Sequence, residues 1–425
     1  MTLTIFAVFI VLIIIGCPIA MTLGLASIAG LLVDGSFHFT IFVQRAFTAV
    51  NSFPLMAIPF FMLAGSLMEH GGISKRIIRC TESFVGHFSG GLAVAGILAC
   101  MIFAAISGSA VATVAAIGGL LVPEMTERKY PVPYSTAVVC AAGTMGPIIP
   151  PSTSFVIYAS IAGISVSDIF MGGYIPGVLM GVGLIVYAVY IAKKRNLPRS
   201  VRVSGKERLK ILGNAIWALF TPIIIVGGIM SGICTPTEAG AVSCVYAFII
   251  GKFVYRELDL KKLREVLKDA AVASSIVMFL IATASVFSWI LTIERIPQIV
   301  KTAFMSFTDN KYVLLLLINI VLLIVGTFMD CTPALTMLVP VLAPLAQAYG
   351  IDLIHLGVIM TINLCIGLLT PPVGTCLFVG CRIGNLKLTE LVKEMWPQMV
   401  VLIIVLMIVT YVPCLSTLLP NLAAA

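Results

Sequence analysis

The sequence has few charged residues and few histidines for its length. Asp, Glu, Lys and Arg make up 10% of its 425 residues, and its four histidines (His38, His70, His87, His355) are scattered. The 11 cysteines contain no CxxC pair, so neither residue type shows the spacing of metal ligands. We also find no P-loop and no Ser-His-Asp set. These absences exclude direct ATP hydrolysis and predict that the chain is not an enzyme.

Apolar sequence is what the chain has in excess. Hydrophobic residues account for 60% of it and the mean hydropathy is +1.13. Many runs approach the roughly 20 residues that an α-helix needs to cross a bilayer, and they are continuous rather than alternating. This pattern predicts an all-α polytopic membrane protein and excludes an outer-membrane barrel. The N-terminus has no basic segment before its apolar run, so we interpret it as a retained span.

Two stretches repeat the same Gly and Pro positions at an offset of 221, the separation of Pro150 from Pro371. Gly146-Pro-Ile-Ile-Pro-Pro-Ser152 corresponds to Gly367-Leu-Leu-Thr-Pro-Pro-Val373. A diproline cannot continue a helix, and in lipid such a break is tolerated only where protein or a cavity surrounds it. Paired breaks in two halves indicate a transporter's binding site. Two packing kinks are the alternative.

The apolar runs divide the chain into two repeats, 1–192 and 213–425, joined by a basic linker at 193–212. Each repeat has a predicted helical hairpin with a polar tip (92–125 and 313–349) and a broken helix (134–163 and 353–384). Each hairpin arm is expected to be about 15 residues, short for a full crossing. The further predicted spans are 3–16, 18–33, 53–68, 172–192, 213–231, 238–252, 271–291 and 396–420. Ordinary antiparallel spans with unusual loops remain the alternative to re-entrant hairpins.

The basic residues predict the orientation. When the 193–210 loop is placed in the cytoplasm, all but four of the 26 Lys and Arg residues (Arg45, Arg295, Lys301, Lys311) fall on that side. The two repeats then have inverted topologies, and both termini are periplasmic. The polar stretches 34–52 and 253–270 precede the third span of each half, and we expect interfacial helices there. Solvated loops are the alternative.

Inverted hairpins and broken helices bring half-helix ends to the middle of the membrane. The N-terminal ends favour anionic substrates, and the opposing carbonyls favour Na⁺. Asp330, at the second tip, is the residue most indicative of function, because acids are costly inside a membrane. It could ligate a cation, contact substrate, or cap a helix starting at Thr332. Glu238 fits a capping box with Thr235, a structural role.

These motifs resemble a known family. Ala57-Ile-Pro-Phe-Phe-Met-Leu-Ala-Gly65, Ser107-Gly-Ser-Ala-Val-Ala112 and the first break are similar to the large permease subunit of tripartite ATP-independent periplasmic (TRAP) transporters. So are Thr235-Pro-Thr-Glu-Ala-Gly240, Met329-Asp-Cys-Thr-Pro333 and the second break, and the resemblance covers essentially the whole chain.

The resemblance implies an elevator-type secondary importer in the bacterial inner membrane. Its substrate would be an organic acid anion, driven by a gradient of Na⁺ with two or more ions coupled. Sialic acid is favoured over a C4-dicarboxylate or a sugar acid on overall likeness. The implied partners are a small four-helix membrane subunit on a separate chain and a periplasmic substrate-binding protein, with no role for nucleic acid.

The resemblance also implies the site residues. Substrate contact is expected at Ser109, Ser154 and Asp330, with Arg295 as an external carboxylate partner. Ion binding is expected at the tips and breaks: Ser107, Gly108, Ser109, Gly146, Pro150, Ser152, Asp330, Thr332, Gly367 and Thr370. The rival hypotheses are a broken-helix ion exchanger or channel that needs no binding protein, and an intramembrane enzyme.

Overall fold

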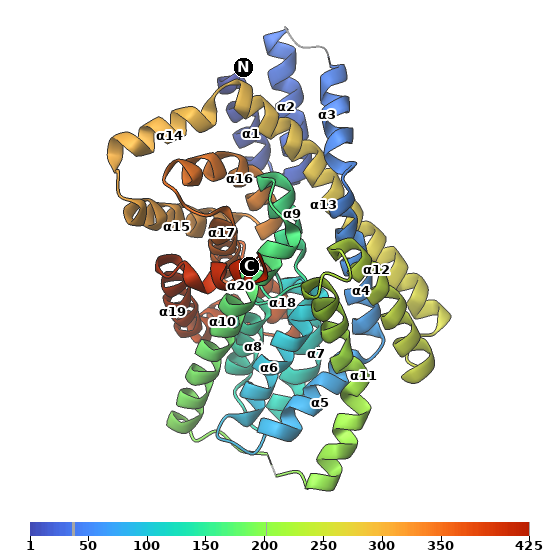
Figure 1. Cartoon of the computed structure of the whole chain (residues 1–425). Helices are drawn as coiled ribbons and strands as arrows, with labels where there is room; N and C mark the ends of the chain where they lie inside the picture. The colour runs from blue at the N-terminus through green and yellow to red at the C-terminus, as the bar shows by residue number, and fades with distance from the viewer. Residues whose placement is uncertain (36–38, 201, 425) are drawn as a thin grey trace.

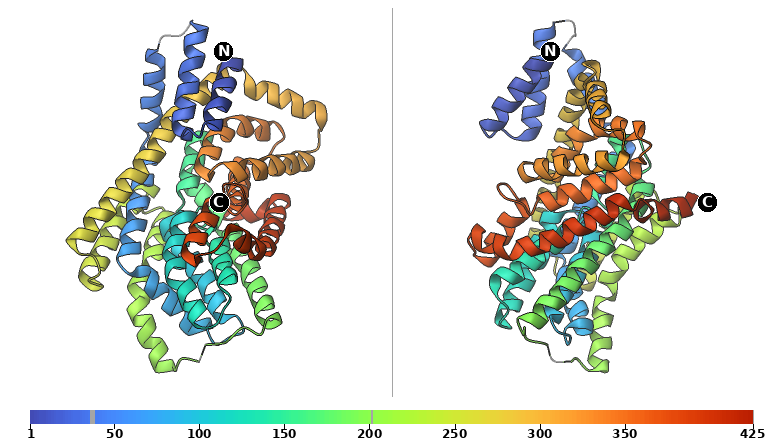
Figure 2. Two further views of the ribbon diagram at one scale, coloured as in Figure 1. Left: turned by 180° about the vertical axis from the view of Figure 1, so that it is seen from behind. Right: turned by 90° about the vertical axis from the view of Figure 1, so that its left-hand side faces the viewer.

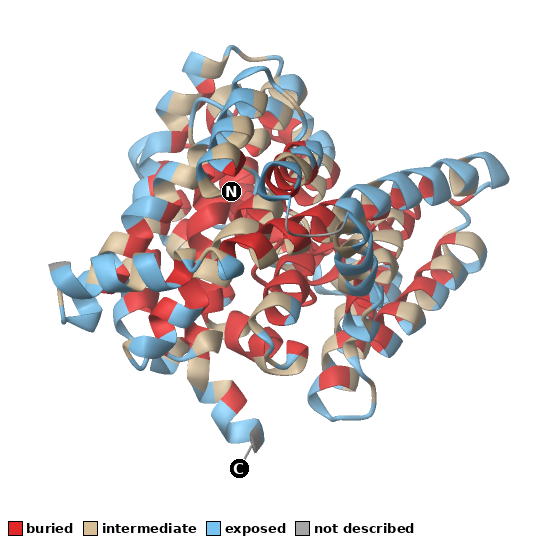
Figure 3. Cartoon of the chain, turned by 90° about the horizontal axis from the view of Figure 1, so that it is seen from above, coloured by how far each residue is buried: buried red, intermediate tan, exposed pale blue. Residues whose placement is uncertain are grey.

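The computed structural model describes residues 1–35, 39–200 and 202–424, and within them the chain is helical with no strand. Nine helices in this described part are long and apolar enough to cross a membrane. The prediction of an all-α polytopic membrane protein is therefore confirmed. Buried residues gather in the centre of the molecule, and the helices at its edge are largely exposed (Figure 3).

The first half runs from α1 to α10. Its elements are α1 (Thr2–Ile14), α2 (Ile19–Asp34), α3 (Thr40–Val50), the 3₁₀ turn η1 (Phe53–Met56), α4 (Ala57–His70), α5 (Ile73–Val85), α6 (Gly91–Ser107), α7 (Ala110–Glu127), α8 (Val132–Gly143), α9 (Thr153–Ala162) and α10 (Val166–Lys194) (Figure 1). The predicted division of 3–33 is confirmed, because Pro18 separates α1 from α2.

The second half repeats this order. It comprises α11 (Gly205–Met230), α12 (Pro236–Ile249), the π-helix η2 (Ile250–Val254), α13 (Leu260–Ile293), α14 (Ile296–Phe307), α15 (Lys311–Phe328), α16 (Cys331–Ala348), α17 (Leu353–Gly367), α18 (Thr375–Gly384), α19 (Leu388–Tyr411) and α20 (Cys414–Ala424). At the 221-residue offset α6 and α7 fall on α15 and α16, and α8 and α9 fall on α17 and α18. The inverted membrane orientation of the halves stays a prediction.

The separate interfacial helix predicted at 253–270 is wrong. Residues 260–293 form one continuous helix, α13, in which the polar stretch and the span 271–291 are joined. At about 1.5 Å per residue, 34 residues exceed the roughly 30 Å hydrocarbon core, so the amphipathic part extends the span. In the first half the equivalent segment is divided, because Pro54 in η1 separates α3 from α4. Residues 36–38 of the predicted stretch 34–52 lie outside the described residues.

Two further expectations need correction. The hairpin arms are longer than the 15 residues expected: α6 has 17 and the other three have 18. Arm length therefore does not distinguish a re-entrant hairpin from a pair of spans. The predicted span 396–420 is also divided, into α19 and α20. The division falls at Pro413, because the residue before a proline is disfavoured in the helical region and Val412 has φ −120° and ψ 79°.

The long helix α13 forms one side of the molecule. It packs against α2, α3 and α4 along its length, and its middle faces the second hairpin through α16 (Figure 1). The views in Figure 2 show the hairpins and broken helices grouped beside this wall. α14 links the end of α13 to the second hairpin and packs on α16.

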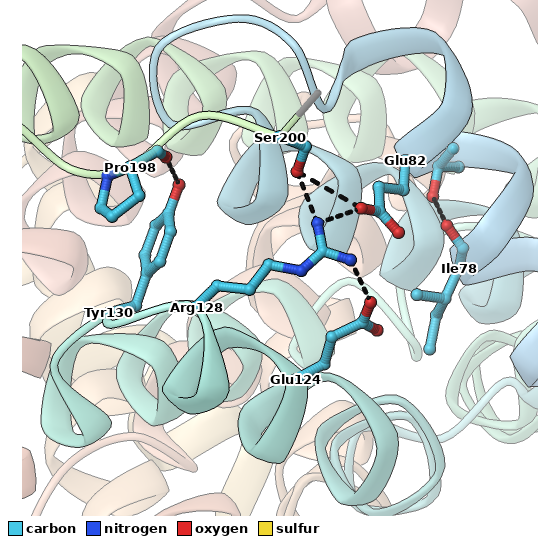
Figure 4. Close-up of polar contacts among 8 residues, drawn as sticks. Ile78, Glu82, Glu124, Arg128, Tyr130, Pro198 and Ser200 are labelled. Carbon is cyan, nitrogen blue, oxygen red and sulfur yellow. Dashed lines mark hydrogen bonds and ion pairs between the residues drawn. The ribbon is translucent and has the colours of Figure 1, made fainter. Parts of the chain in front are cut away.

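The base of the first hairpin is fixed to α5 and to the linker. The Arg128 guanidinium pairs with Glu82 on α5, and its second amino group lies 2.7 Å from the Glu124 carboxylate (Figure 4). It also donates to the Ser200 hydroxyl at 2.6 Å. The Tyr130 hydroxyl donates to the Pro198 carbonyl at 2.8 Å. These contacts hold the start of the 193–212 linker beneath α7, away from the tip.

Candidate functional site

Both tips and both breaks meet at one cavity of about 230 Å³. The first half contributes Gly108, Ser109, Ala110, Val111, Pro147, Thr153 and Ser154, and the second contributes Asp330, Cys331, Thr332, Pro333 and Leu368. Two helices outside the tips and breaks, α4 and α13, complete it with Met62, Ile276, Val277 and Leu280. Segments separated by more than 200 residues in sequence thus form a single site.

Three helices begin at this cavity. α7 starts after Ser109, α9 after Ser152 and α16 after Asp330, and each of these residues caps its helix through its side chain. The caps accept one N–H each, so other first-turn N–H groups have no partner within their helix. Each N-terminus carries a partial positive charge. The backbone at the cavity therefore favours an anion, whereas the Asp330 carboxylate at the start of α16 opposes one.

The first tip packs directly on the first break. A methyl group added at Gly108 would lie 2.9 Å from the Pro151 carbonyl oxygen, and Gly108 has φ +60°. Glycine is favoured here because the backbone is left-handed and the approach is close. The Thr153 hydroxyl donates to the Gly108 carbonyl at 3.3 Å. The predicted association of the first tip with the first break is what these contacts show.

The predicted first-half ion residues are all close to this junction. A methyl group at Gly146 would lie 2.5 Å from the Ser109 carbonyl oxygen, so the backbones touch. The Ser152 hydroxyl donates to the Pro147 carbonyl and accepts from the Phe155 N–H at 3.2 Å. Pro150 is buried in the same break, and its bond to Pro151 is cis, as is that between Pro371 and Pro372.

Ser107, the other predicted residue of the first tip, faces inward. Its hydroxyl lies 2.9 Å from that of Thr113 and 3.4 Å from the Ser109 carbonyl oxygen. It is buried and does not line the cavity. Its contacts organise the tip, and Thr113 is a partner that sequence reasoning missed.

The second junction is built from backbone. A methyl group at Gly367 would lie 2.5 Å from the Gly326 carbonyl carbon, so α15 and α17 are in backbone contact. The Val373 N–H donates to the Thr327 carbonyl at 3.2 Å. The Thr370 hydroxyl bonds back to Ile366 at 3.3 Å. Gly367 and Thr370 therefore lie at a tip-to-break junction, as predicted, but not among the cavity-lining residues.

Asp330 and Ser154 meet across the cavity through Cys331. The Asp330 carboxylate accepts the Cys331 N–H at 2.7 Å through one oxygen and caps α16, which starts at Cys331 rather than Thr332. The Cys331 thiol lies 3.6 Å from the buried Ser154 hydroxyl. Thr332 lines the same space. Three of the four predicted substrate residues, Ser109, Ser154 and Asp330, are thus brought together.

The fourth, Arg295, is placed elsewhere. It is exposed at the start of α14, with φ 55°, and does not line the cavity. The cavity instead has an apolar wall that the sequence did not indicate, formed by Met62 of α4 and by Ile276, Val277 and Leu280 of α13. These side chains read as ordinary membrane-span residues, so no local signal distinguishes them.

A buried polar network behind the second break was also missed. The Asn363 amide donates to the Asn319 side-chain oxygen at 2.7 Å, and Asn319 donates to the Thr410 hydroxyl at 3.1 Å. His355 contacts the Thr410 carbonyl at 3.2 Å and the Ser416 hydroxyl at 2.7 Å. Lone amides in apolar runs were the available signal. Across the described residues, no three His, Cys, Asp or Glu side chains gather as metal ligands, so a cation at the tips and breaks would be held by carbonyls and hydroxyls, with Asp330 as the acid available at the cavity.

Comparison with known proteins identifies the family. A profile described as "Tripartite ATP-independent periplasmic transporter, DctM component" matches residues 6–415. The chain belongs to this DctM family. It is therefore a transporter component and not an enzyme, and the resemblance found in the motifs is confirmed.

Relatives within the DctM family are named for different substrates. The chain is 44% identical to the isethionate TRAP transporter permease protein DctMQ of Oleidesulfovibrio alaskensis, covering 96% of this chain and 65% of that longer protein. It is 42% identical to the C4-dicarboxylate large permease DctM of Vibrio cholerae, covering 96% and 95%. It is 39% identical to the sialic acid large permease SiaM of the same species, again covering 96% and 95%.

A solved structure shares the fold. The crystal structure of the Alcanivorax borkumensis YdaH transporter, described as having an unusual topology, matches with a TM-score of 0.62 over 88% of each chain. The two sequences are 15% identical, so the likeness concerns the arrangement of helices alone.

Proposed function

We propose that the chain is the large subunit of a Na⁺-coupled importer that moves an organic acid anion across the bacterial inner membrane. The observation that carries this proposal is the convergence of three helix N-termini, those of α7, α9 and α16, on one cavity of about 230 Å³. Helix N-termini attract anions through free N–H groups and the helix dipole.

The named substrates of the relatives support an anion. Isethionate is a sulfonate, and sialic acid and C4-dicarboxylates are carboxylates, so the substrates named for the three relatives share an acidic group. Donation from backbone N–H groups suits both sulfonate and carboxylate oxygens. The Asp330 carboxylate would repel such a group at close range. We therefore assign Asp330 to a coupling ion or to a substrate hydroxyl.

The tip-to-break junctions are where Na⁺ would bind. They gather hydroxyls and backbone carbonyls from Ser107, Gly108 and Ser109 with Gly146, Pro150 and Ser152, and from Gly367 and Thr370 with Gly326 and Thr327. Oxygen ligands of this kind suit a hard cation at broken helices. Two equivalent junctions support two or more ions per cycle.

The lining of the cavity supports an elevator motion. Its hydrogen-bonding groups all come from the tips and breaks, whereas α4 and α13 contribute Met62, Ile276, Val277 and Leu280. An apolar wall makes no directional bond to a bound anion, so tips, breaks and substrate could slide past it together. The fixed part would be stabilised by a small four-helix subunit, and a periplasmic binding protein would deliver the acid.

A second cavity bears on the choice of acid. It has about 250 Å³, lies farther along α9, α13 and α16, and has four hydroxyl residues in its lining, Ser160, Ser285, Ser288 and Thr336. A polyhydroxylated acid such as sialic acid or a sugar acid would find hydrogen-bond partners there that a C4-dicarboxylate does not need. This keeps sialic acid as our preferred substrate.

The test is uptake into proteoliposomes containing the chain and its small subunit, with the binding protein outside. We expect labelled acid to accumulate only when Na⁺ is higher outside. Accumulation that follows a proton gradient after Na⁺ is equalised would reject the coupling ion. Uptake that needs no binding protein, or single-channel currents, would favour the exchanger or channel instead. Competition by isethionate, succinate and sialic acid ranks the three substrate classes.

A further inference from the structure

A third cavity, of about 390 Å³, lies at the opposite end of the molecule from the N-terminus, between α5, α11 and the segment after η2 (Figure 1). Three basic side chains line it, Lys75, Arg76 and Arg79, together with one acid, Glu257. It shares no lining residue with the cavity at the tips and breaks. The transport site therefore does not account for it.

The cavity has an excess of positive charge. Arg76 is held by the Glu257 carboxylate at 2.7 Å and by the Tyr255 ring at 3.6 Å, so the acid is already paired. Lys75 and Arg79 are exposed and lie one helical turn apart on α5. Glu124 interacts electrostatically with Arg79, but this acid already forms an ion pair with Arg128. Two like charges at this spacing repel one another unless an anion lies between them.

The cavity lies at the depth of lipid headgroups. On α11 the charged residues end at Lys210, and the cavity is lined by Ile211, Asn214 and Trp217 in the first two turns of the apolar run. Trp217 and Tyr255 bring two aromatic rings to it, and Trp and Tyr concentrate at membrane interfaces. The predicted orientation makes this interface cytoplasmic, where anionic lipids are found.

The face of α11 that lines the cavity continues toward the middle of the membrane as apolar sequence. Trp217 of the cavity is followed at spacings of three and four residues by Phe220 and Ile224, and 47% of the Trp217 surface and 44% of the Phe220 surface are exposed. An acyl chain would lie along this face while its headgroup stayed among the basic residues. A soluble anion would gain nothing from it.

We propose that this cavity binds the phosphate group of an anionic phospholipid. Lys75 supplies a mobile point charge and Arg79 a planar donor fork, both of which suit phosphate oxygens. Arg76, fixed by Glu257 and Tyr255, forms the floor. The bound lipid joins α5 to α11, and α5 connects α4 to the first hairpin. The site is independent of which acid the protein transports.

The test uses the full chain in detergent, with native mass spectrometry and thermal unfolding. Dioleoylphosphatidylglycerol is the probe, dioleoylphosphatidylcholine the neutral lipid with the same chains, and millimolar inorganic phosphate the soluble anion. The variant Lys75→Gln/Arg79→Gln removes the two free charges. The matched control, Lys206→Gln/Lys210→Gln, removes two exposed charges at the same spacing on α11, outside the cavity.

We expect one phosphatidylglycerol retained per wild-type chain, a higher melting temperature with it than with phosphatidylcholine, and about thirtyfold weaker binding in the Lys75/Arg79 variant. The control should bind like the wild type. Equal losses in both variants would mean general surface charge and would overturn the proposal. Equal retention of phosphatidylcholine, or phosphate binding without lipid binding, would overturn it too. The single variant Lys75→Gln tests the loss of phosphatidylglycerol binding in a folded protein. Its melting temperature in phosphatidylcholine should equal that of the wild type.

Discussion

The two tip-to-break junctions have the same frame but are held together differently. In the first, the break is buried, Ser152 caps α9, and the Thr153 hydroxyl reaches the Gly108 carbonyl. In the second, Pro371, Pro372 and Val373 are exposed, α18 begins after Gly374 with no side-chain cap, and the Val373 N–H bonds to the Thr327 carbonyl near the end of α15. Backbone contacts secure both junctions, and a side-chain hydroxyl bond between tip and break is added in the first.

The tips differ in charge as well as in bonding. At the repeat offset Ser109 corresponds to Asp330, and Ser152 corresponds to Val373. The first half thus supplies neutral donors and acceptors, whereas the second supplies the acid at the cavity and the more exposed break. Segments with exposed backbone and few side-chain bonds open at lower free-energy cost. We therefore expect the first junction to be the rigid part of the site and the second junction to be the part that opens more readily.

The largest effect is expected when a methyl group is added at the glycine of closest approach in each junction. Gly146→Ala and Gly367→Ala each place a carbon 2.5 Å from backbone atoms of the facing tip or hairpin arm, which cannot move cheaply. We expect both to lower the free energy of unfolding by about 3 kcal/mol in detergent denaturation. Gly119→Ala, where nothing lies within 4 Å, is the control and should be neutral or stabilising. A harmless Gly367→Ala would show that the second junction is not held by backbone contact.

Exchanging the acid tests the charge asymmetry. Asp330→Asn keeps a capping side chain but removes the charge, so we expect folding to be retained and Na⁺-driven uptake to fall about tenfold or more. Ser109→Ala removes a neutral group and should cost about threefold. Initial uptake rates at several Na⁺ concentrations, at equal amounts of folded protein, measure both. Wild-type uptake by Asp330→Asn would leave Asp330 as a helix cap.

The capping difference predicts a smaller, one-sided effect. Ser152→Ala removes the bond from the Phe155 N–H and the bond to Pro147, and should destabilise the protein by about 1–2 kcal/mol. Val373→Ala, at the matching position, should change stability by less than about 0.5 kcal/mol because Val373 is exposed and does not cap. Thermal unfolding of the two variants in the same detergent gives the answer. Equal effects would contradict the assignment of a rigid first junction.

The smallest expected effect concerns the bridge between tip and break. Thr153→Val keeps the shape of the side chain and removes its 3.3 Å bond to the Gly108 carbonyl. We expect about 1 kcal/mol of destabilisation and a modest drop in uptake, since Thr153 also lines the cavity. Thr370→Val, whose hydroxyl bonds back to the Ile366 carbonyl near the end of α17 and does not bridge to the tip, is the comparison and should lose less stability. Melting temperatures measure this difference, and Thr153→Val should melt at the lower temperature of the two.

Sequence patterns predicted most of the helical elements because Gly and Pro act locally. The diprolines, Pro18 and the polar tips end helices through their own backbone chemistry, so both breaks and both hairpins were visible in the chain. The capping box of Thr235 and Glu238 is confirmed for the same reason. Where an amphipathic stretch continues into a span without a breaker, as in α13, the sequence misled, because polarity alone does not end a helix.

The sequence by itself determined that this is a helical membrane protein with two matching breaks, since apolar runs and helix breakers act over a few residues. Its motifs, through the family resemblance, also named Ser109, Ser154 and Asp330 as candidate substrate contacts. Only the tertiary structure decided that these three share a cavity while Arg295 lies elsewhere, and that Met62 and Leu280 form its apolar wall. The physical reason is distance along the chain. Which helices pack together depends on contacts between segments hundreds of residues apart, and a membrane-span residue facing a cavity looks like one facing lipid.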